Sequence, residues 1–227
     1  MQSIARKLGL DPGTTPPVEV AINHVSVLVH DVRAAAAPFV QAGHAIGEFE
    51  AFEAEGTDEV YLGPPDSGAR LLLQAPHGPG PYLRAYRKRG AGLHHIALDV
   101  SDLPAFAARM GEIGWLLHPV SLLNFQKQRP VFFARPGVPV LLEVAQQAPV
   151  AAEAFINRVL VPVAAGNERF ITGLNLPALQ AVSSGGFSIR IGGTAWRLVA
   201  GQPVADQTTP AGTVPDAANP PIAGQRT

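Results

Sequence analysis

The chain has 227 residues, and its charges nearly cancel, because 17 Lys and Arg residues stand against 18 Asp and Glu residues for a formal net charge of −1. Such a chain has no positive field to gather polyanions, which argues against nucleic acid as a partner. It also contains no cysteine. Disulfides, thiolate metal sites and cysteine nucleophiles are therefore excluded, and only histidine and carboxylate side chains remain for metal chemistry.

The two ends of the sequence are expected to lie outside the folded core. The N-terminal segment, residues 1–20, lacks the apolar stretch of a signal peptide, and no later stretch approaches the roughly 18 apolar residues of a membrane span. We therefore expect a cytoplasmic protein that does not enter a membrane. Residues 202–227 are rich in Pro, Ala, Thr and Gly, a composition that predicts a disordered tail.

Between these ends the sequence repeats itself. The segment HVSVLVHDV, which begins at His24, has a counterpart in HIALDVSDL, which begins at His95. The shift of 71 residues (95 − 24) also aligns Gly43 with Gly114, without a gap. The chain therefore contains a duplicated structural unit.

Each copy predicts one strand, one helix and three further strands. An alternating apolar run (25–29 or 96–100) comes first, followed by an Asp as candidate N-cap and an Ala-rich helix (32–42 or 103–113) that ends at a Gly. Three apolar runs follow in each copy: 45–49, 59–62 and 70–74 in the first, and 115–119, 131–134 and 138–144 in the second.

The predicted fold is thus α+β, with two tandem βαβββ modules, 21–76 and 92–147, joined by a linker helix at 79–90. We expect the two curved sheets to lie side by side around one shared cleft. Residues at equivalent positions of the two copies would then face each other, so that His24 and His95 meet polar groups of the last strands. Glu143 stands among Val and Leu residues, where an unpaired carboxylate would be costly.

These residues resemble the vicinal oxygen chelate superfamily, which includes glyoxalase I, extradiol dioxygenases, bleomycin-resistance proteins and methylmalonyl-CoA epimerase. The strongest motif is Gly-Ala-Gly-Leu-His-His-Ile-Ala at 90–97, which is similar to a segment of the epimerase. The segment from Phe132 to Glu143 resembles its final hairpin. The similarity covers about residues 22–147.

The resemblance implies a metal site and a reaction. His24, His95 and Glu143 correspond to family ligands of a divalent ion such as Co, Mn, Zn, Mg or Fe, and Glu59 corresponds to an acid/base carboxylate. The implied activity is that of an epimerase or isomerase, in which Glu59 and Glu143 remove and return a proton next to a carbonyl. The implied substrate is a small molecule, with an acyl-CoA as one candidate, and the implied assembly is a homodimer.

One position departs from the family pattern. The epimerase carries a Gln or Glu ligand where this chain has Leu72. Gln74 lies two residues further along the same strand, and hence on the same face, as a displaced ligand. Without Gln74 the site has two histidines and one carboxylate, an arrangement known for non-haem iron. An iron-dependent extradiol-type dioxygenase and a non-catalytic binding protein therefore remain alternatives.

Several other features are interpreted structurally. We expect His94 to face away from the cleft and Glu48, Glu50, Glu53 and Glu55 to form a solvated loop. Arg84, Arg87, Lys88 and Arg89 are expected on an exposed helix face, with binding of a coenzyme A phosphate as the functional alternative. Residues 148–201 form a C-terminal extension, with an amphipathic helix at 149–163 and a hairpin at 186–199 that turns at Gly192-Gly193. It would cover a sheet edge, support a dimer contact or cap the cleft.

Overall fold

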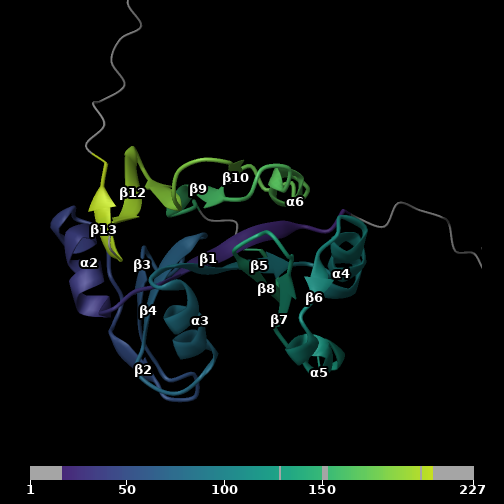
Figure 1. Ribbon diagram of the computed structural model, residues 1–227, viewed down its shortest axis with the longest axis horizontal. Helices are drawn as coiled ribbons and strands as arrows, with labels where there is room; N and C mark the ends of the chain where they lie inside the picture. Colours follow the sequence, from purple (N-terminus) through teal and green to yellow (C-terminus); the bar gives the residue numbers. More distant parts are fainter. Residues whose placement is uncertain (1–16, 128, 150–152, 200, 207–227) are drawn as a thin grey trace, which may run out of the picture.

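The computed structural model describes residues 17–127, 129–149, 153–199 and 201–206. Its strands form one eight-stranded and one five-stranded sheet, which lie one above the other in Figure 1. The α+β class and the two βαβββ modules are confirmed. The first module contains β1 (Val20–Leu28), α2 (Val32–Gln41), β2 (Glu50–Phe52), β3 (Thr57–Leu62) and β4 (Arg70–Pro76).

Helix α3 (Pro81–Arg89) links the first module to the second. The second contains β5 (Gly92–Val100), α4 (Leu103–Glu112), β6 (Leu116–Leu117), β7 (Val131–Ala134) and β8 (Leu141–Gln146). A 3₁₀ turn, η1 (Pro119–Ser121), and the short helix α5 (Leu122–Gln126) stand between β6 and β7. The basic side chains of α3 are exposed, as expected: Arg84, Arg87, Lys88 and Arg89.

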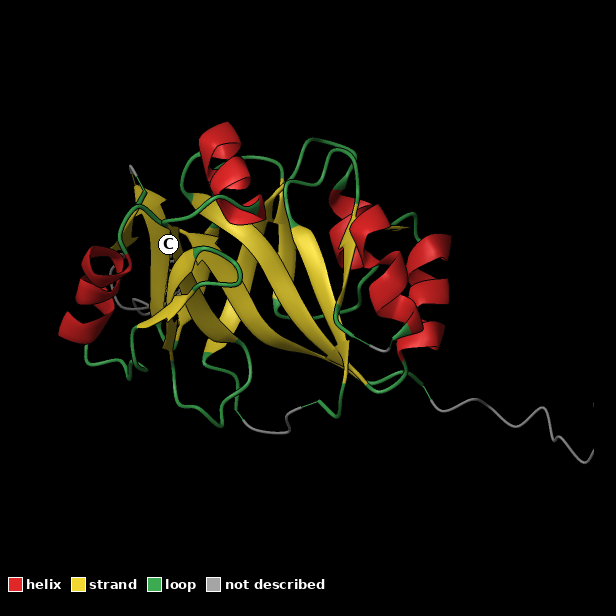
Figure 2. Cartoon of the chain, turned by 90° about the horizontal axis from the view of Figure 1, so that it is seen from below, coloured by secondary structure: helices red, strands yellow, loops and turns green. Residues whose placement is uncertain are grey.

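The two modules join edge to edge rather than lying side by side as separate sheets. Strands β1 and β5 pair antiparallel at the centre of the order β2-β3-β4-β1-β5-β8-β7-β6. Outward from this pair, each module places its last strand first, then its third, then its second. β1 pairs parallel with β4, as β5 does with β8. The result is one continuous curved layer of strands (Figure 2).

Local sequence signals account for the matching helices of the two copies. The Asp31 side chain accepts a hydrogen bond from the backbone N–H of Ala34 at 2.8 Å, and Asp102 caps α4 in the same way at 2.9 Å. Gly43 and Gly114 follow the helices with φ of 83° and 90°, a conformation that only glycine adopts without strain.

The strand expected at 45–49 is wrong in position. Within that stretch Ile46 makes a single bridge to Leu62, and the regular strand β2 begins only at Glu50. Gly47 interrupts the run, and a glycine weakens a strand because it offers no side chain to pack.

Alternation along the central strands separates the two faces of the large sheet. Val25, Val27, Leu71 and Leu73 belong to the main hydrophobic core, together with residues of α2 and α4. Their neighbours along β1 and β4 point to the other face, which bears α3. That second face carries buried polar side chains of the central strands, among them His24, Ser26, Gln74 and His95.

The C-terminal extension is a five-stranded sheet with the order β10-β9-β11-β12-β13. Its elements are β9 (Ile156–Pro162), α6 (Glu168–Thr172), β10 (Leu179–Val182), β11 (Ser188–Ile191), β12 (Thr194–Val199) and β13 (Gln202–Ala205). The hairpin expected at 186–199 is confirmed as β11 and β12, with its turn at Gly192 and Gly193.

Two expectations for this region are wrong. The helix expected at 149–163 is strand β9 over the part from Ile156 onward, because its apolar spacing also fits a strand that two neighbours can pair with. Residues 150–152 of that stretch lie outside the described residues. The tail expected from 202 begins with strand β13, which pairs with β12, whereas residues 207–227 lie outside the described residues.

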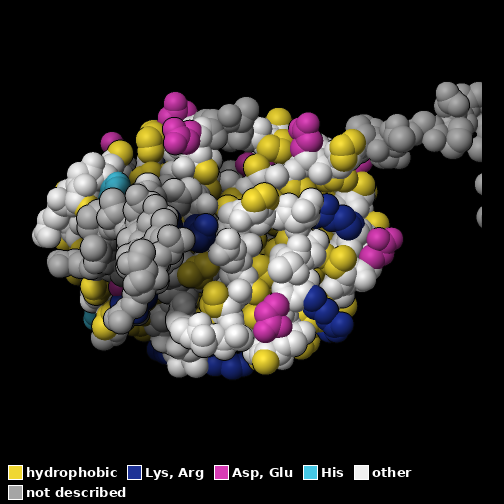
Figure 3. All heavy atoms as spheres, turned by 90° about the horizontal axis from the view of Figure 1, so that it is seen from above, with side chains coloured by type: hydrophobic (Ala, Val, Ile, Leu, Met, Phe, Trp, Pro, Cys, Tyr) yellow, Lys and Arg dark blue, Asp and Glu magenta, His cyan; other side chains and the backbone are white. Residues whose placement is uncertain are grey.

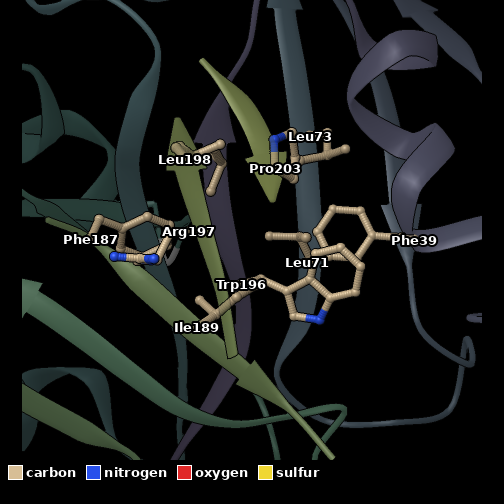
Figure 4. A pocket seen from close by; sticks show the side chains of 10 residues that line it. Phe39, Leu71, Leu73, Phe187, Ile189, Trp196, Arg197, Leu198 and Pro203 are labelled. Atoms are coloured by element: carbon tan, nitrogen blue, oxygen red, sulfur yellow. The ribbon is translucent and has the colours of Figure 1, made fainter. Parts of the chain in front are cut away.

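The extension covers the face of the large sheet opposite to the polar face. The Trp196 ring stacks on Phe39 of α2 with 4.1 Å between ring centres, and Figure 4 shows the two beside Leu71 and Leu73. The described part of the extension therefore lies away from the polar face of the large sheet and does not cap it.

Figure 3 looks onto the upper side of the molecule, where the extension lies. Lysine, arginine and carboxylate side chains are scattered over this face without a cluster of one sign. Among the described residues, no helix is long and apolar enough to cross a membrane.

Candidate metal centre

The polar face of the large sheet brings together two histidines and a carboxylate from three adjacent strands. His24 comes from β1, His95 from β5 and Glu143 from β8. Ala97 of β5 lies between two of them, paired with His24 on one side and with Glu143 on the other. Because its side chain is a single methyl group, the imidazole and the carboxylate can converge above it.

The distances fit a shared cation. His24 Nε2 lies 3.1 Å from His95 Nε2, and His95 Nε2 lies 3.2 Å from Glu143 Oε2. One ligand atom of each residue lies within 4.8 Å of the other two. Donors that share an ion at about 2.0 to 2.2 Å stand roughly 3.0 to 3.5 Å apart, so the three groups need little rearrangement to bind one.

Burial keeps the two imidazoles neutral. Desolvation lowers the pKa of His24 to about 4, with a smaller contribution from the positive charge of Arg70. Desolvation also lowers the pKa of His95 well below its ordinary value. Neutral imidazoles each offer a lone pair at physiological pH, the form in which histidine binds metals.

The carboxylate of Glu143 has the opposite response. Burial, with a smaller contribution from the negative charges of Glu55 and Glu59, raises its pKa to about 7. The carboxylates of Glu55 and Glu59 thus act on Glu143, an arrangement that a bound cation would stabilise.

Glu59 comes from β3, on the side of the two histidines opposite to Glu143 of β8. Its Oε1 accepts hydrogen bonds from Thr57 Oγ1 at 2.6 Å and from Gln74 Nε2 at 2.7 Å. Ser26 Oγ in turn donates to Gln74 Oε1. Gln74 lies on the expected face and is buried, but its amide links Ser26 to Glu59.

Leu72 occupies the position that the 71-residue shift pairs with Glu143. It is buried, and its backbone pairs with Tyr61 of β3 and with Ser26 of β1. It alternates with the core residues Leu71 and Leu73, so its side chain lies on the polar face beside the candidate ligands.

Sequence analysis missed Glu55 and Tyr82. Glu55 is expected in a solvated loop, but it is partly buried and its carboxylate accepts a hydrogen bond from the Tyr82 hydroxyl of α3. Burial raises the pKa of both groups. The backbones of Gly56 and Gly78 are in contact, and this contact brings the turn that carries Glu55 against the segment before α3.

His94 was expected to face away from the cleft, and this is wrong. Its Nδ1 lies 2.9 Å from Nδ1 of His95, and its ring lies 4.7 Å from that of Tyr82. Arg70 was also missed: its guanidinium lies over the Tyr61 ring, 4.2 Å from the ring centre, and Tyr61 lies edge-on to His24.

The family model of the glyoxalase/bleomycin resistance protein/dioxygenase superfamily matches residues 23–153, more than half of the chain. The chain belongs to this superfamily. The resemblance inferred from the motif at 90–97 is therefore confirmed. The extension beyond residue 153 lies outside the matched part of this superfamily member.

Solved structures similar to this superfamily member include methylmalonyl-CoA epimerases. The enzyme from Mycobacterium tuberculosis has 28% identity over 57% of this chain and 89% of its own, with a TM-score of 0.44. A hypothetical protein from Bacillus halodurans has 19% identity over 60% and 99%, with a TM-score of 0.48. An epimerase in complex with methylmalonyl-CoA and NH4+ has 23% identity over 60% and 98%, with a TM-score of 0.42. No curated protein matches the chain significantly.

Proposed function

We propose that the chain is a metal-dependent enzyme of the epimerase or isomerase type, which abstracts a proton next to a carbonyl group. The observation that supports this most is the convergence of His24 Nε2, His95 Nε2 and Glu143 Oε2. A second carboxylate, Glu59, enters from the other side of the same cleft. This donor set suits Co, Mn, Zn, Mg or Fe, and such a cation would stabilise negative charge that develops on a substrate oxygen.

In this proposal Glu59 is the residue that removes the proton. Both of its side-chain hydrogen bonds among the described residues go to Oε1, so Oε2 is available to the substrate. Thr57 and Gln74 hold the carboxylate in one orientation, as a general base requires. Glu143, protonated on the oxygen that does not face the cation, would return a proton from the opposite side and be left ionised, while Glu59 keeps the proton that it removed. Gln74 then positions Glu59, and its role as a displaced ligand stays a prediction.

The proposed substrate is a small acyl compound, with an acyl-CoA as the first candidate. Arg70 lies beside His24 and Tyr61 and offers a positive charge to a substrate carboxylate. The exposed basic side chains of α3 offer contacts for the phosphates of coenzyme A. A homodimer remains a prediction, which sedimentation analysis of the purified protein would test.

A second candidate function is supported by Leu72. Because an apolar side chain stands where a fourth ligand is expected, the site presents two histidines and one carboxylate, which is also the ligand set of non-haem iron oxygenases. Metal analysis of protein purified without added metal distinguishes the proposed enzyme, a dioxygenase and a non-catalytic binding protein. Iron together with oxygen uptake on a catechol would support a dioxygenase, and the absence of any metal binding would support a non-catalytic binder.

The direct test follows the exchange of the acyl α-proton of methylmalonyl-CoA with solvent deuterium by NMR, with Co²⁺-loaded protein. We expect exchange with the unaltered chain and a loss of about 10²- to 10⁴-fold in Glu59→Gln, with unchanged metal content. Glu53→Gln, an exposed carboxylate of the neighbouring turn, is the matched control and should retain full exchange. Equal exchange in Glu59→Gln would contradict the role given to Glu59.

A further inference from the structure

Two β-bulges interrupt the pairing of the central strands β1 and β5. Between Ile22 and His24 the register slips by one residue, which leaves Asn23 as the extra residue of β1. Between Ser26 and Val27 the partner on β5 changes from His95 to Leu93, which leaves His94 as the extra residue of β5. A bulge re-aims side chains that alternation would otherwise send to opposite faces. Each extra residue directly precedes a candidate ligand.

The first bulge places Asn23 against His24. Asn23 Nδ2 donates to Asp99 Oδ2 at 2.9 Å, and Asn23 Oδ1 lies 2.8 Å from His24 Nδ1. A carboxylate only accepts, so Asp99 fixes which end of the Asn23 amide faces it. The amide oxygen therefore faces His24, whose Nδ1 must carry the proton and whose Nε2 must carry the lone pair. Asp99 is itself buried and also accepts from Gln147 Nε2.

The second bulge places His94 against His95. Their Nδ1 atoms lie 2.9 Å apart, and of two neutral imidazoles at this distance one must donate and the other must accept. When His94 accepts, Nδ1 of His95 carries the proton and Nε2 of His95 is free to bind a cation. Unlike the amide of Asn23, His94 can take either role, because a neutral imidazole exists in two tautomers.

The two bulges are equivalent under the internal repeat, since 23 + 71 = 94. The duplicated unit thus provides each of the two candidate histidine ligands with a hydrogen-bond partner at the preceding position. Partners that bind the other nitrogen of a ligand imidazole fix its tautomer and ring orientation in metal sites. We propose that Asn23 and His94 are positioning residues: Asn23 fixes the Nδ1–H tautomer of His24, and His94 accepts from Nδ1 of His95 when a cation is bound, so that Nε2 of each ligand faces the cation. This inference rests on the metal site of the proposed function.

Because Asn23 has a fixed acceptor and His94 does not, His24 and His95 should differ in whether their tautomer changes when metal is added. His24 Nε2 and His95 Nε2 lie 3.1 Å apart, so two lone pairs would face each other in metal-free protein. Only His95 can relieve this contact by carrying a proton on Nε2, because Asn23 holds the proton of His24 on Nδ1. His24 is therefore expected as the Nδ1–H tautomer with and without metal, whereas His95 changes from Nε2–H to Nδ1–H when Zn²⁺ is added.

The test uses the full chain with ¹⁵N-labelled histidine, whose tautomers are resolved by long-range ¹H–¹⁵N NMR. In Asn23→Ala we expect His24 to lose its fixed Nδ1–H tautomer and the Zn²⁺ affinity to fall about 10- to 100-fold. Asn157→Ala, which removes an exposed asparagine of β9, is the control for loss of an amide and should change neither. Thermal unfolding of each variant monitors the fold.

Exchanging the side chains of Asn23 and Asp99 distinguishes a positioning role of Asn23 from a merely structural one. Asp99→Asn alone frees the Asn23 amide to turn and should give mixed His24 tautomers. In the double variant Asn23→Asp, Asp99→Asn the hydrogen bond between positions 23 and 99 reverses its direction, the side chain at 23 only accepts, and the Nδ1–H tautomer of His24 should be restored. An unchanged tautomer and affinity in Asn23→Ala would overturn the proposal. If the metal-free tautomers behave as expected but no metal binds, the positioning role stands and the proposed function fails.

Discussion

Burial determines how single side chains of the cleft respond to pH. The pKa of His24 and of His94 falls to about 4 because the charged imidazole loses its hydration, while the same loss raises the pKa of Glu143 to about 7. Each shift favours the neutral form. Neutral histidines can bind a cation near pH 7 without first releasing protons, whereas Glu143 gains a negative charge that strengthens its contact with a cation only when it ionises.

The raised pKa of Glu143 predicts a pH-dependent stability difference. Between the ordinary value of 4.5 and about 7 the folded protein holds a proton that the unfolded chain has lost. The free energy of unfolding contributed by Glu143 therefore decreases as pH rises through this range. Glu143→Gln does not have this pH-dependent decrease. The free energy of unfolding of the variant minus that of the unaltered protein should therefore rise by about 3 kcal/mol from pH 4.5 to pH 8. Urea unfolding with EDTA measures this, and a constant difference would contradict it.

Leu72 predicts a gain of metal affinity by substitution. Leu72→Gln places an amide oxygen on the face that holds the candidate ligands, and the Zn²⁺ affinity should rise about tenfold, which corresponds to ~1.4 kcal/mol. The metal-free variant should lose about 1 to 3 kcal/mol of stability, because a polar group is buried without a partner. Leu73→Gln, whose side chain lies in the core on the other face, is the control. Calorimetric titration should show a gain for Leu72→Gln alone.

At the scale of elements, the sequence predicts best what local chemistry determines. The ends of α2 and α4 follow from the Asp31 and Asp102 side chains and from the glycines after each helix. Strand β9 was mistaken for a helix because its apolar residues fit both periods, and only pairing with β10 and β11 decides between them. The bulges at Asn23 and His94 depend on the partner strand and leave no signal in either segment alone.

The five-stranded sheet predicts that stability and metal binding can be altered separately. Trp196 is almost fully buried and stacks on Phe39, on the side of the large sheet away from the cleft. Trp196→Ala should cost about 3 to 5 kcal/mol of unfolding free energy, with the Zn²⁺ affinity changed less than about twofold, since contacts on the other face persist. Phe52→Ala, at an exposed aromatic, is the control. A parallel loss of affinity in Trp196→Ala would show that the two faces are coupled.

For the whole molecule, the internal repeat was the most informative feature of the sequence. It predicts that His24 and His95 lie at equivalent positions of paired strands, and these two side chains do meet, with Glu143 beside them. Glu55, Tyr82 and His94 could not be found in this way. They reach the cleft through a turn, a helix start and a bulge, whose placement depends on packing between distant segments rather than on the spacing of residues.

The continuous sheet also determines how the cleft can respond to an occupant. Strands β1 and β5 are hydrogen-bonded along most of their length. The two modules therefore belong to one sheet, and a hinge motion between them would break these hydrogen bonds. Shape adjustment then falls to the turn that carries Glu55. This turn is joined to the segment before α3, because His77 N and Gly78 N both donate to Gly56 O. The turn and the start of α3, with Tyr82, would therefore shift as one unit when a molecule enters.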